Sequence, residues 1–289
     1  MAIWIAVLLG VIQGIFMFVP VSSTAHLVIT QHWLIRQGHD LPPPESAEMI
    51  LFDLVVHVGT LVSIAVVFWS SLRQLVAGII RQAWQWAAAG GRVRQELLYL
   101  RLGLLCVASV GVTAAVGFTL KAAFEQVFAS PVLVAGTLTM TGVLLWWTDR
   151  LSRRPRGLRQ INLPIAAMIG AAQGFALVPG LSRSGMTIVF ALFSGLKRRW
   201  AAEYSFFLAI PTILAATLVQ AIEVEIGDGL GEISLTALAV AFVVSAVVGI
   251  ASLKLVLYFL YRANLKVFSF YLWLLAIIVA LGFLDPTHI

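Results

Sequence analysis

Long apolar runs separated by short polar connections dominate the chain. A helix that crosses a bilayer needs about 20 predominantly apolar residues. Runs of this kind lie at about 2–19, 49–70, 97–120, 131–148, 161–178, 201–222, 233–257 and 267–284. Because backbone groups in lipid must find their hydrogen-bond partners within the same helix, the pattern predicts an all-α polytopic membrane protein whose runs are spanning or re-entrant segments.

The stretch from residue 73 to 90 follows a different pattern. Arg73 and Arg81 share it with the apolar residues Val76 and Ile80 at helical spacing. A helix of this kind has one apolar side and one basic side, which suits the boundary between lipid and water. We therefore expect an interfacial helix here and not a span.

Composition agrees with lipid as the main solvent. The chain is 61% hydrophobic and 11% charged, with a mean hydropathy of +0.98, whereas soluble domains carry roughly 25% charged residues. The formal net charge is +6. Basic residues cluster in two short loops, at Arg150, Arg153, Arg154, Arg156 and Arg159 and at Lys197, Arg198 and Arg199. Such loops are typical of the cytoplasmic side, so we expect no nucleic-acid partner. The acidic loop at 223–232 and the prolines at 42–44 are expected to face outward.

An internal repeat divides the chain. Residues 10–23 read GVIQGIFMFVPVSS and residues 170–182 read GAAQGFALVPGLS, so both copies contain Gly-x-x-Gln-Gly followed by Pro and Ser. Proline interrupts a helix, and freed backbone groups at membrane depth are tolerated only within protein or beside a wet cavity. The repeat predicts a single integral membrane domain over 1–289, with halves of about 1–148 and 161–289. We expect an inverted-topology repeat with two re-entrant or broken helix segments and a site between them.

The first broken segment carries hydroxyl groups and an imidazole. Ser22, Ser23, Thr24 and His26 follow closely on Pro20. Ser23 and His26 would share one helical face, where a hydroxyl beside an imidazole supplies a nucleophile with a base, or a phosphate contact with an acid. In the alternative interpretation, the hydroxyls cap the restarted helix and His26 only bonds a neighbour.

The second broken segment carries an arginine among hydroxyl groups. Arg183 lies between Ser182 and Ser184, with Thr187 one turn further on. An arginine at membrane depth costs roughly 2.5–3.5 kcal/mol on insertion scales, and its planar fork suits a pair of phosphate oxygens. Snorkelling to lipid headgroups is the alternative. Together with loop amides at a helix start, these groups predict an anion site.

Three further ionisable residues are candidates for supporting roles. Asp53 and His57 are four residues apart and would face the same side of a helix. They would orient a catalytic group or help to hold a cation. In the alternative interpretation, they form a buried pair in which each is the other's polar partner. Glu203 either reaches the site or serves as a carboxylate near the start of its helix.

The chain resembles the undecaprenyl-diphosphatase family, also known as bacitracin-resistance proteins, over nearly its whole length. The similarity is sharpest in QGIFMFVPVSSTAHL (13–27), FDLVVHVGTL (52–61), GAAQGFALVPGLSRSGMTI (170–188) and AAEYSFFLAIP (201–211). The resemblance implies removal of the terminal phosphate from a polyprenyl diphosphate lipid, which regenerates the carrier for cell-wall synthesis. It also implies a multi-pass protein of the bacterial inner (plasma) membrane whose site opens toward the outer leaflet, and it leaves a homodimer open.

Carried over by position, the resemblance assigns roles to individual residues. Ser23 and His26 match the catalytic serine and histidine, and Ser182, Arg183 and Thr187 match the diphosphate-binding loop. We expect Arg183 to act in catalysis as well. The other polar residues expected to contact the diphosphate are Gln13, Ser22, Thr24, Ser182, Ser184 and Thr187.

One departure from the family pattern concerns the cofactor. The family usually has glutamate where this chain has Met17, and Gln13 stands at a second position that is acidic or Gln. Those glutamates are implicated in binding a divalent cation, so the resemblance implies Mg²⁺ or Ca²⁺. Methionine is a poor ligand for either, because both require oxygen donors. Asp53 and Glu203 are the candidate replacements, and the metal ligands stay undetermined.

Two functions compete on this evidence. The first is a phosphatase, by serine attack or by attack of an activated water, with Arg183 neutralising charge on the phosphoryl group. The second is a non-hydrolytic polyprenyl-phosphate binding protein or lipid-carrier translocator that has lost hydrolysis at Met17. We favour the phosphatase, because the hydroxyl–imidazole pair and the arginine loop are both retained.

Overall fold

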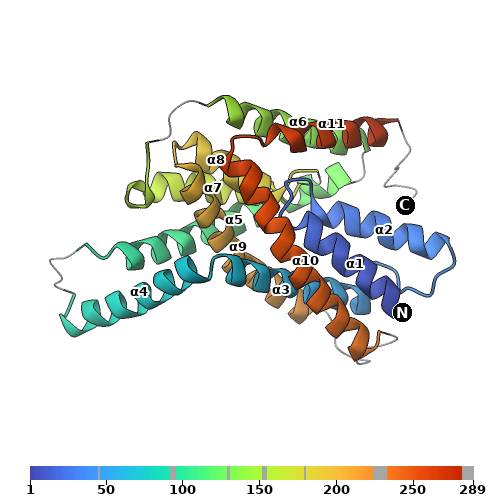
Figure 1. Cartoon of the computed structure of the whole chain (residues 1–289), viewed down its shortest axis with the longest axis horizontal. Coiled ribbons are helices and arrows are strands. Elements are labelled where there is room, and N and C mark those ends of the chain that lie inside the picture. Colours follow the sequence, from blue (N-terminus) through green and yellow to red (C-terminus); the bar gives the residue numbers. More distant parts are fainter. Residues whose placement is uncertain are drawn as a thin grey trace.

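The computed structural model describes residues 1–44, 46–91, 96–128, 131–151, 155–178, 180–223 and 233–281, with only the backbone of 24–25, 121–128, 131 and 221–223. This part of the chain forms eleven α-helices and one short 3-10 helix (Figure 1), which confirms the predicted all-α class. The helices are α1 (Ile3–Phe16), α2 (Ser23–Arg36), α3 (Ala47–Val67), α4 (Trp69–Ala88), α5 (Leu98–Phe128), α6 (Pro131–Arg150), α7 (Leu163–Phe175), α8 (Arg183–Phe193), α9 (Arg198–Glu223), α10 (Leu235–Tyr261) and α11 (Lys266–Ala280). Pro179 and the predicted acidic loop beyond residue 223 lie outside the described residues.

In the described part of the chain, five helices are long and apolar enough to cross a membrane. They lie within α3, α5, α6, α9 and α10. The apolar runs at 2–19, 161–178 and 267–284 instead form the shorter helices α1, α7 and α11. With 14 residues and a rise of 1.5 Å per residue, α1 is about 21 Å long, less than the ~30 Å hydrocarbon core. The chain is a multi-pass membrane protein by these helices, and within the described residues three of the apolar runs form helices shorter than the five candidate spans.

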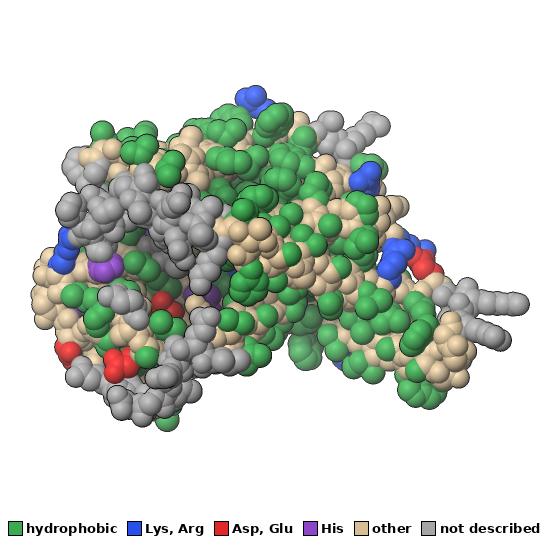
Figure 2. All heavy atoms as spheres, turned by 180° about the vertical axis from the view of Figure 1, so that it is seen from behind, with side chains coloured by type: hydrophobic (Ala, Val, Ile, Leu, Met, Phe, Trp, Pro, Cys, Tyr) green, Lys and Arg blue, Asp and Glu red, His purple; other side chains and the backbone are tan. Residues whose placement is uncertain are grey.

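Helix α4 is the helix expected at the membrane surface. It is not among the five long apolar helices, and its apolar residues Val76, Ile80 and Trp84 are exposed. In Figure 1, α4 and the first part of α5 lie side by side at one end of the molecule. Apolar side chains cover large parts of the face in Figure 2, and the visible Lys and Arg side chains lie near its margins.

The glycines of the two repeat copies lie where helices pack closely. Helix α1 packs along α10, and α7 packs along α5. A Cβ atom at Gly14 would lie 2.9 Å from the carbonyl oxygen of Ser245, and one at Gly174 would lie 3.0 Å from that of Thr113. Small residues allow this approach between membrane helices. The glycines of the Gly-x-x-Gln-Gly motif therefore allow close helix packing. The two glutamines of the motif make different contacts, and Gln173 donates hydrogen bonds to hydroxyls of neighbouring helices.

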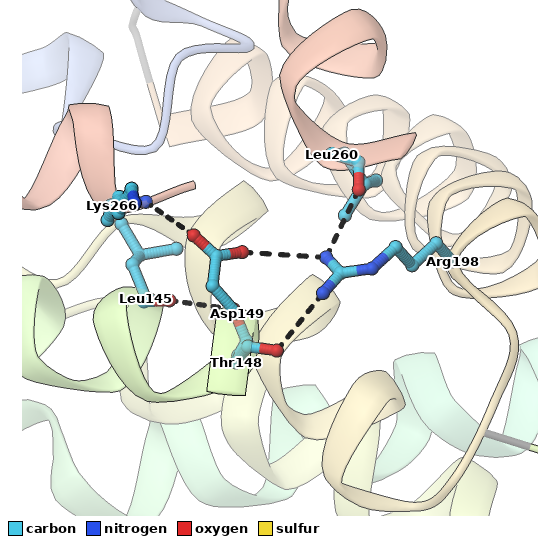
Figure 3. Close-up of polar contacts among 6 residues, drawn as sticks. All are labelled: Leu145, Thr148, Asp149, Arg198, Leu260 and Lys266. Atoms are coloured by element: carbon cyan, nitrogen blue, oxygen red, sulfur yellow. Dashed lines mark hydrogen bonds and ion pairs between the residues drawn. The ribbon is translucent and has the colours of Figure 1, made fainter. Parts of the chain in front are cut away.

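The ends of four helices are fastened together at one face (Figure 3). Arg198 at the start of α9 lies 3.6 Å from Asp149 of α6 and donates to the carbonyl oxygens of Leu260 and Thr148, each at 3.1 Å. Asp149 accepts from the backbone N–H of Lys266 at 2.8 Å. Both partners of the ion pair are largely buried. The ends of α6 and α10 and the starts of α9 and α11 therefore share one face. Arg153 and Arg154 of the predicted basic loop lie outside the described residues.

Candidate functional site

Both repeat copies contain a true break between two helices. Helix α1 ends at Phe16 and α2 begins at Ser23, whereas α7 ends at Phe175 and α8 begins at Arg183. Each break contains a residue in the left-handed backbone region, Ser22 with φ of 69° and Gly180 with φ of 84°. For a serine this conformation costs about 1–3 kcal/mol. The helix interruptions predicted from the sequence are confirmed, and the backbone of the first is strained at Ser22.

The two breaks touch each other. The Ser184 hydroxyl donates to the carbonyl oxygen of Phe18 at 3.2 Å. Arg183 Nη2 lies 3.6 Å from the sulfur of Met17. Segments that lie far apart in the sequence therefore meet at one place inside the protein.

Three donor groups converge on the buried sulfur of Met17. Besides Arg183 Nη2, the amide Nε2 of Gln13 lies 3.5 Å away and the hydroxyl of Ser23 lies 4.0 Å away. A thioether is a weak acceptor. Gln13 Oε1 and Arg183 Nη1 are buried and have no hydrogen-bond partner in the described part of the chain. Arg183 Nη1 and the donors that face the sulfur keep their capacity for a stronger acceptor, such as a phosphate oxygen, whereas Gln13 Oε1 is itself an acceptor.

The start of α8 is shaped by hydroxyls that bond to their own helix. Ser182 accepts from the backbone N–H of Gly185 at 3.2 Å and shares a hydrogen bond with Ser184. Thr187 donates to the carbonyl oxygens of Arg183 and Ser184 at 3.0 and 3.2 Å. All three hydroxyl side chains are buried. They fix the turn that presents Arg183, and the first turn of α8 adds its amide dipoles.

The imidazole of His26 is held from three sides. Its Nδ1 lies 2.8 Å from the carbonyl oxygen of Ser22. Because a carbonyl only accepts, Nδ1 carries a proton, and in the neutral ring Nε2 then accepts from the Tyr271 hydroxyl at 2.6 Å. The ring stacks on Phe16 with centroids 3.9 Å apart. The strained Ser22 therefore contributes the carbonyl that fixes the tautomer of His26.

The structure places Ser23 and His26 in the first turn of α2, but no hydrogen bond joins them in the described part of the chain. The Thr24 side chain lies outside the described residues. Tyr271 was missed by sequence reasoning: it lies in α11, 245 residues from His26. Tyrosines are common at membrane boundaries, so an isolated tyrosine in an apolar run gives no signal of a site.

The supporting candidates divide into two places. The Asp53 carboxylate accepts from Gln31 at 3.1 Å, and His57 Nδ1 donates to the backbone oxygen of Asp53 at 2.6 Å. These contacts join Asp53 to α2 and His57 to its own helix. Glu203 instead pairs with Arg199 at 2.8 Å near the start of α9, as expected of a carboxylate near a helix start.

The described residues do not suit Mg²⁺ or Ca²⁺ at this position. Within the described ranges, no three His, Cys, Asp or Glu side chains gather closely enough to hold a metal ion. Around Met17 the groups are an amide, a hydroxyl, a guanidinium and a thioether. Both cations take oxygen ligands, with carboxylates prominent among them, whereas the oxygens of these groups, Gln13 Oε1 and the Ser23 hydroxyl, are neutral. The donor set fits an anion better than a hard cation.

Fold and site together define a multi-pass helical membrane protein with a candidate anion site between two broken helices. The chain belongs to the family described as bacitracin resistance protein BacA, whose profile matches residues 6–278. The predicted resemblance is thereby confirmed.

Named relatives match over almost the full length. The undecaprenyl-diphosphatase of Alkalilimnicola ehrlichii is 68% identical over 99% of this chain and 98% of its own length. That of Halorhodospira halophila is 66% identical over 99% of both chains. The undecaprenyl-diphosphatase of Moorella thermoacetica is 34% identical over 96% of this chain and 97% of its own.

Proposed function

We propose that this chain is an undecaprenyl-diphosphatase, which removes the terminal phosphate of undecaprenyl diphosphate. The observation that carries the proposal is the convergence of Gln13, Ser23 and Arg183 on a sulfur that satisfies none of them well. The names of relatives that are 68% and 66% identical support the same activity.

The arginine and the helix start supply binding. The two Nη atoms of Arg183 would hold two oxygens of the terminal phosphate as a fork. The Gln13 amide donates to a third oxygen. The backbone N–H groups in the first turn of α8 carry partial positive charge and attract the phosphate. Stabilisation of charge that grows on the phosphoryl oxygens is the largest contribution that such a site makes to the rate.

Ser23 and His26 carry the chemistry in this proposal. The Ser23 oxygen attacks the terminal phosphorus, its proton passes to Nε2 of His26, and Tyr271 gives up its hydrogen bond as this happens. The bond from phosphorus to the bridging oxygen breaks, and the proton moves to the departing lipid monophosphate. Water then attacks the phosphoserine, releases inorganic phosphate and returns a proton to Ser23. One water is consumed in each cycle.

The architecture that we propose is an inverted repeat of the halves 1–148 and 161–289. Helices α1 and α2 form one re-entrant pair, and α7 and α8 form the other. The equivalent packing of α1 on α10 and of α7 on α5 supports the repeat. In Figure 1 the α1–α2 pair lies to the right of the centre and the α7–α8 pair to the left.

The orientation follows from the basic residues. The face fastened by Arg198 and Asp149 also carries Arg150, Arg156 and Arg159, and positive loops mark the cytoplasmic side. The α1–α2 pair would then enter from the other side. We propose that the protein lies in the bacterial inner membrane with its site open to the outer leaflet.

The activity is tested with purified protein in detergent and undecaprenyl diphosphate. We expect release of inorganic phosphate, and a loss of at least about a hundredfold in Arg183→Ala, since a buried charged contact to the transition state is removed. Phosphate release equal to that of the Arg183→Ala variant would exclude the hydrolytic function. Lipid binding without release would favour the translocator.

A further inference from the structure

The thioether of Met17 lies at the centre of the candidate anion site. Its sulfur lies 3.5 Å from Gln13 Nε2, 3.6 Å from Arg183 Nη2 and 4.0 Å from the Ser23 hydroxyl. A thioether is a weak acceptor, but of the amide, guanidinium, hydroxyl and thioether gathered here it is the group that is oxidised reversibly, to a sulfoxide. A polar cluster therefore surrounds an oxidisable atom.

An oxidised sulfur would carry the acceptor that this cluster lacks. Methionine sulfoxide is polar, and its oxygen would lie among donors that already face the sulfur. Gln13 Nε2, Arg183 Nη2 and the Ser23 hydroxyl would then bond to it. In the proposed function these same groups hold the terminal phosphate and attack its phosphorus. An acceptor attached to the chain has a high effective concentration, so it competes with the phosphate for these donors.

We propose that Met17 is a redox-sensitive modification site, at which oxidation to the sulfoxide by hydrogen peroxide closes the anion site to the lipid diphosphate. The loss of substrate binding in this proposal rests on the proposed function. The modification is reversible, because thiol-dependent reductases return the sulfoxide to the thioether.

The oxidation needs hydrogen peroxide and no other reactant. A lone pair of the Met17 sulfur attacks one peroxide oxygen, and the O–O bond breaks. The departing hydroxide takes the proton that remains on the transferred oxygen and leaves as water. The sulfur gives up two electrons and the peroxide is reduced. Donors such as Gln13 Nε2 and Arg183 Nη2 favour the step, because they stabilise the negative charge that develops on the departing oxygen.

The path of the peroxide is the path of the substrate. The Met17 side chain is only 5% exposed, so the bulk solvent does not reach it freely. In the proposed function, however, a phosphate group and a water molecule must both reach Ser23, whose hydroxyl lies 4.0 Å from the sulfur. Hydrogen peroxide is smaller than a phosphate group, so a site that admits the substrate admits the oxidant.

The test treats purified protein in detergent with hydrogen peroxide, maps the oxidation of each methionine by peptide mass spectrometry, and measures equilibrium binding of undecaprenyl diphosphate. We expect affinity to fall at least about tenfold in step with the gain of one oxygen at Met17. Met17→Leu cannot form a sulfoxide, so its affinity, whatever its starting value, should be the same before and after treatment. Met140→Leu, at an exposed position in α6, is the matched control and should lose affinity as the unchanged protein does.

Two results would overturn the inference. In the first, Met140 is oxidised while Met17 stays a thioether. In the second, Met17 is oxidised but binding is unaffected, or binding falls equally in Met17→Leu. Failure of the proposed function is seen separately, as binding of the lipid without release of phosphate before any treatment.

Discussion

Individual residues of the site were predictable where their chemistry is unusual for lipid. An arginine between two serines and a serine–histidine pair after a proline both stand out against apolar sequence. The contacts that organise them do not stand out. The carbonyl that fixes His26 belongs to Ser22 in a strained conformation, and Tyr271 comes from a distant helix. Such contacts depend on the tertiary fold, and no local sequence pattern predicts them.

Removal of the Tyr271 hydroxyl should slow turnover. Tyr271→Phe keeps the stacked ring but removes the hydrogen bond that orients His26 Nε2 before it accepts the Ser23 proton, so we expect kcat to fall about tenfold with KM unchanged. In a His26→Ala background the same change should have no further effect, since it acts through the imidazole. Tyr258→Phe, whose ring lies against Arg262, is the control. Equal losses with and without His26 would show that Tyr271 has only a structural role.

Helices were predicted reliably by the apolar runs, but their roles were not. The hydropathy of the sequence does not distinguish α1, α7 and α11 from the longer helices, because hydropathy measures composition and not the length of the helix that forms. The prolines and serines revealed the two breaks. The reason for the glycines emerged only from the structure, since it depends on which helix packs opposite.

Gly14→Ala should destabilise the protein. The new Cβ would lie 2.9 Å from both the carbonyl oxygen of Ser245 and the Cβ of Val248, and overpacking of this kind costs about 1–3 kcal/mol. Thermal unfolding in detergent should show a lower midpoint. Gly136→Ala in α6 meets no atom within 4 Å and should leave the midpoint unchanged or raise it. A Gly14→Ala midpoint as high as that of Gly136→Ala would refute the close packing of α1 on α10.

At the scale of the whole molecule, two short helix pairs bring their breaks together, and the longer helices α10 and α5 pack along α1 and α7 (Figure 1). The repeat in the sequence indicated two related halves, and the basic loops indicated a common face. The ion pair of Arg198 and Asp149 fastens four helix ends at that face (Figure 3). Which helix of one half packs on which helix of the other was not predictable, because apolar surfaces in lipid carry little specificity.

The central claim is that the two breaks form one anion site, and a double-mutant cycle across them tests it most directly. Gln13→Ala changes the first segment and Arg183→Ala the second, and both side chains now converge on Met17. We predict that each weakens binding of undecaprenyl diphosphate, and that the double variant loses less than the two changes added together, with a coupling of about 0.5–3 kcal/mol. Strictly additive losses, or no loss from Gln13→Ala, would contradict a shared site.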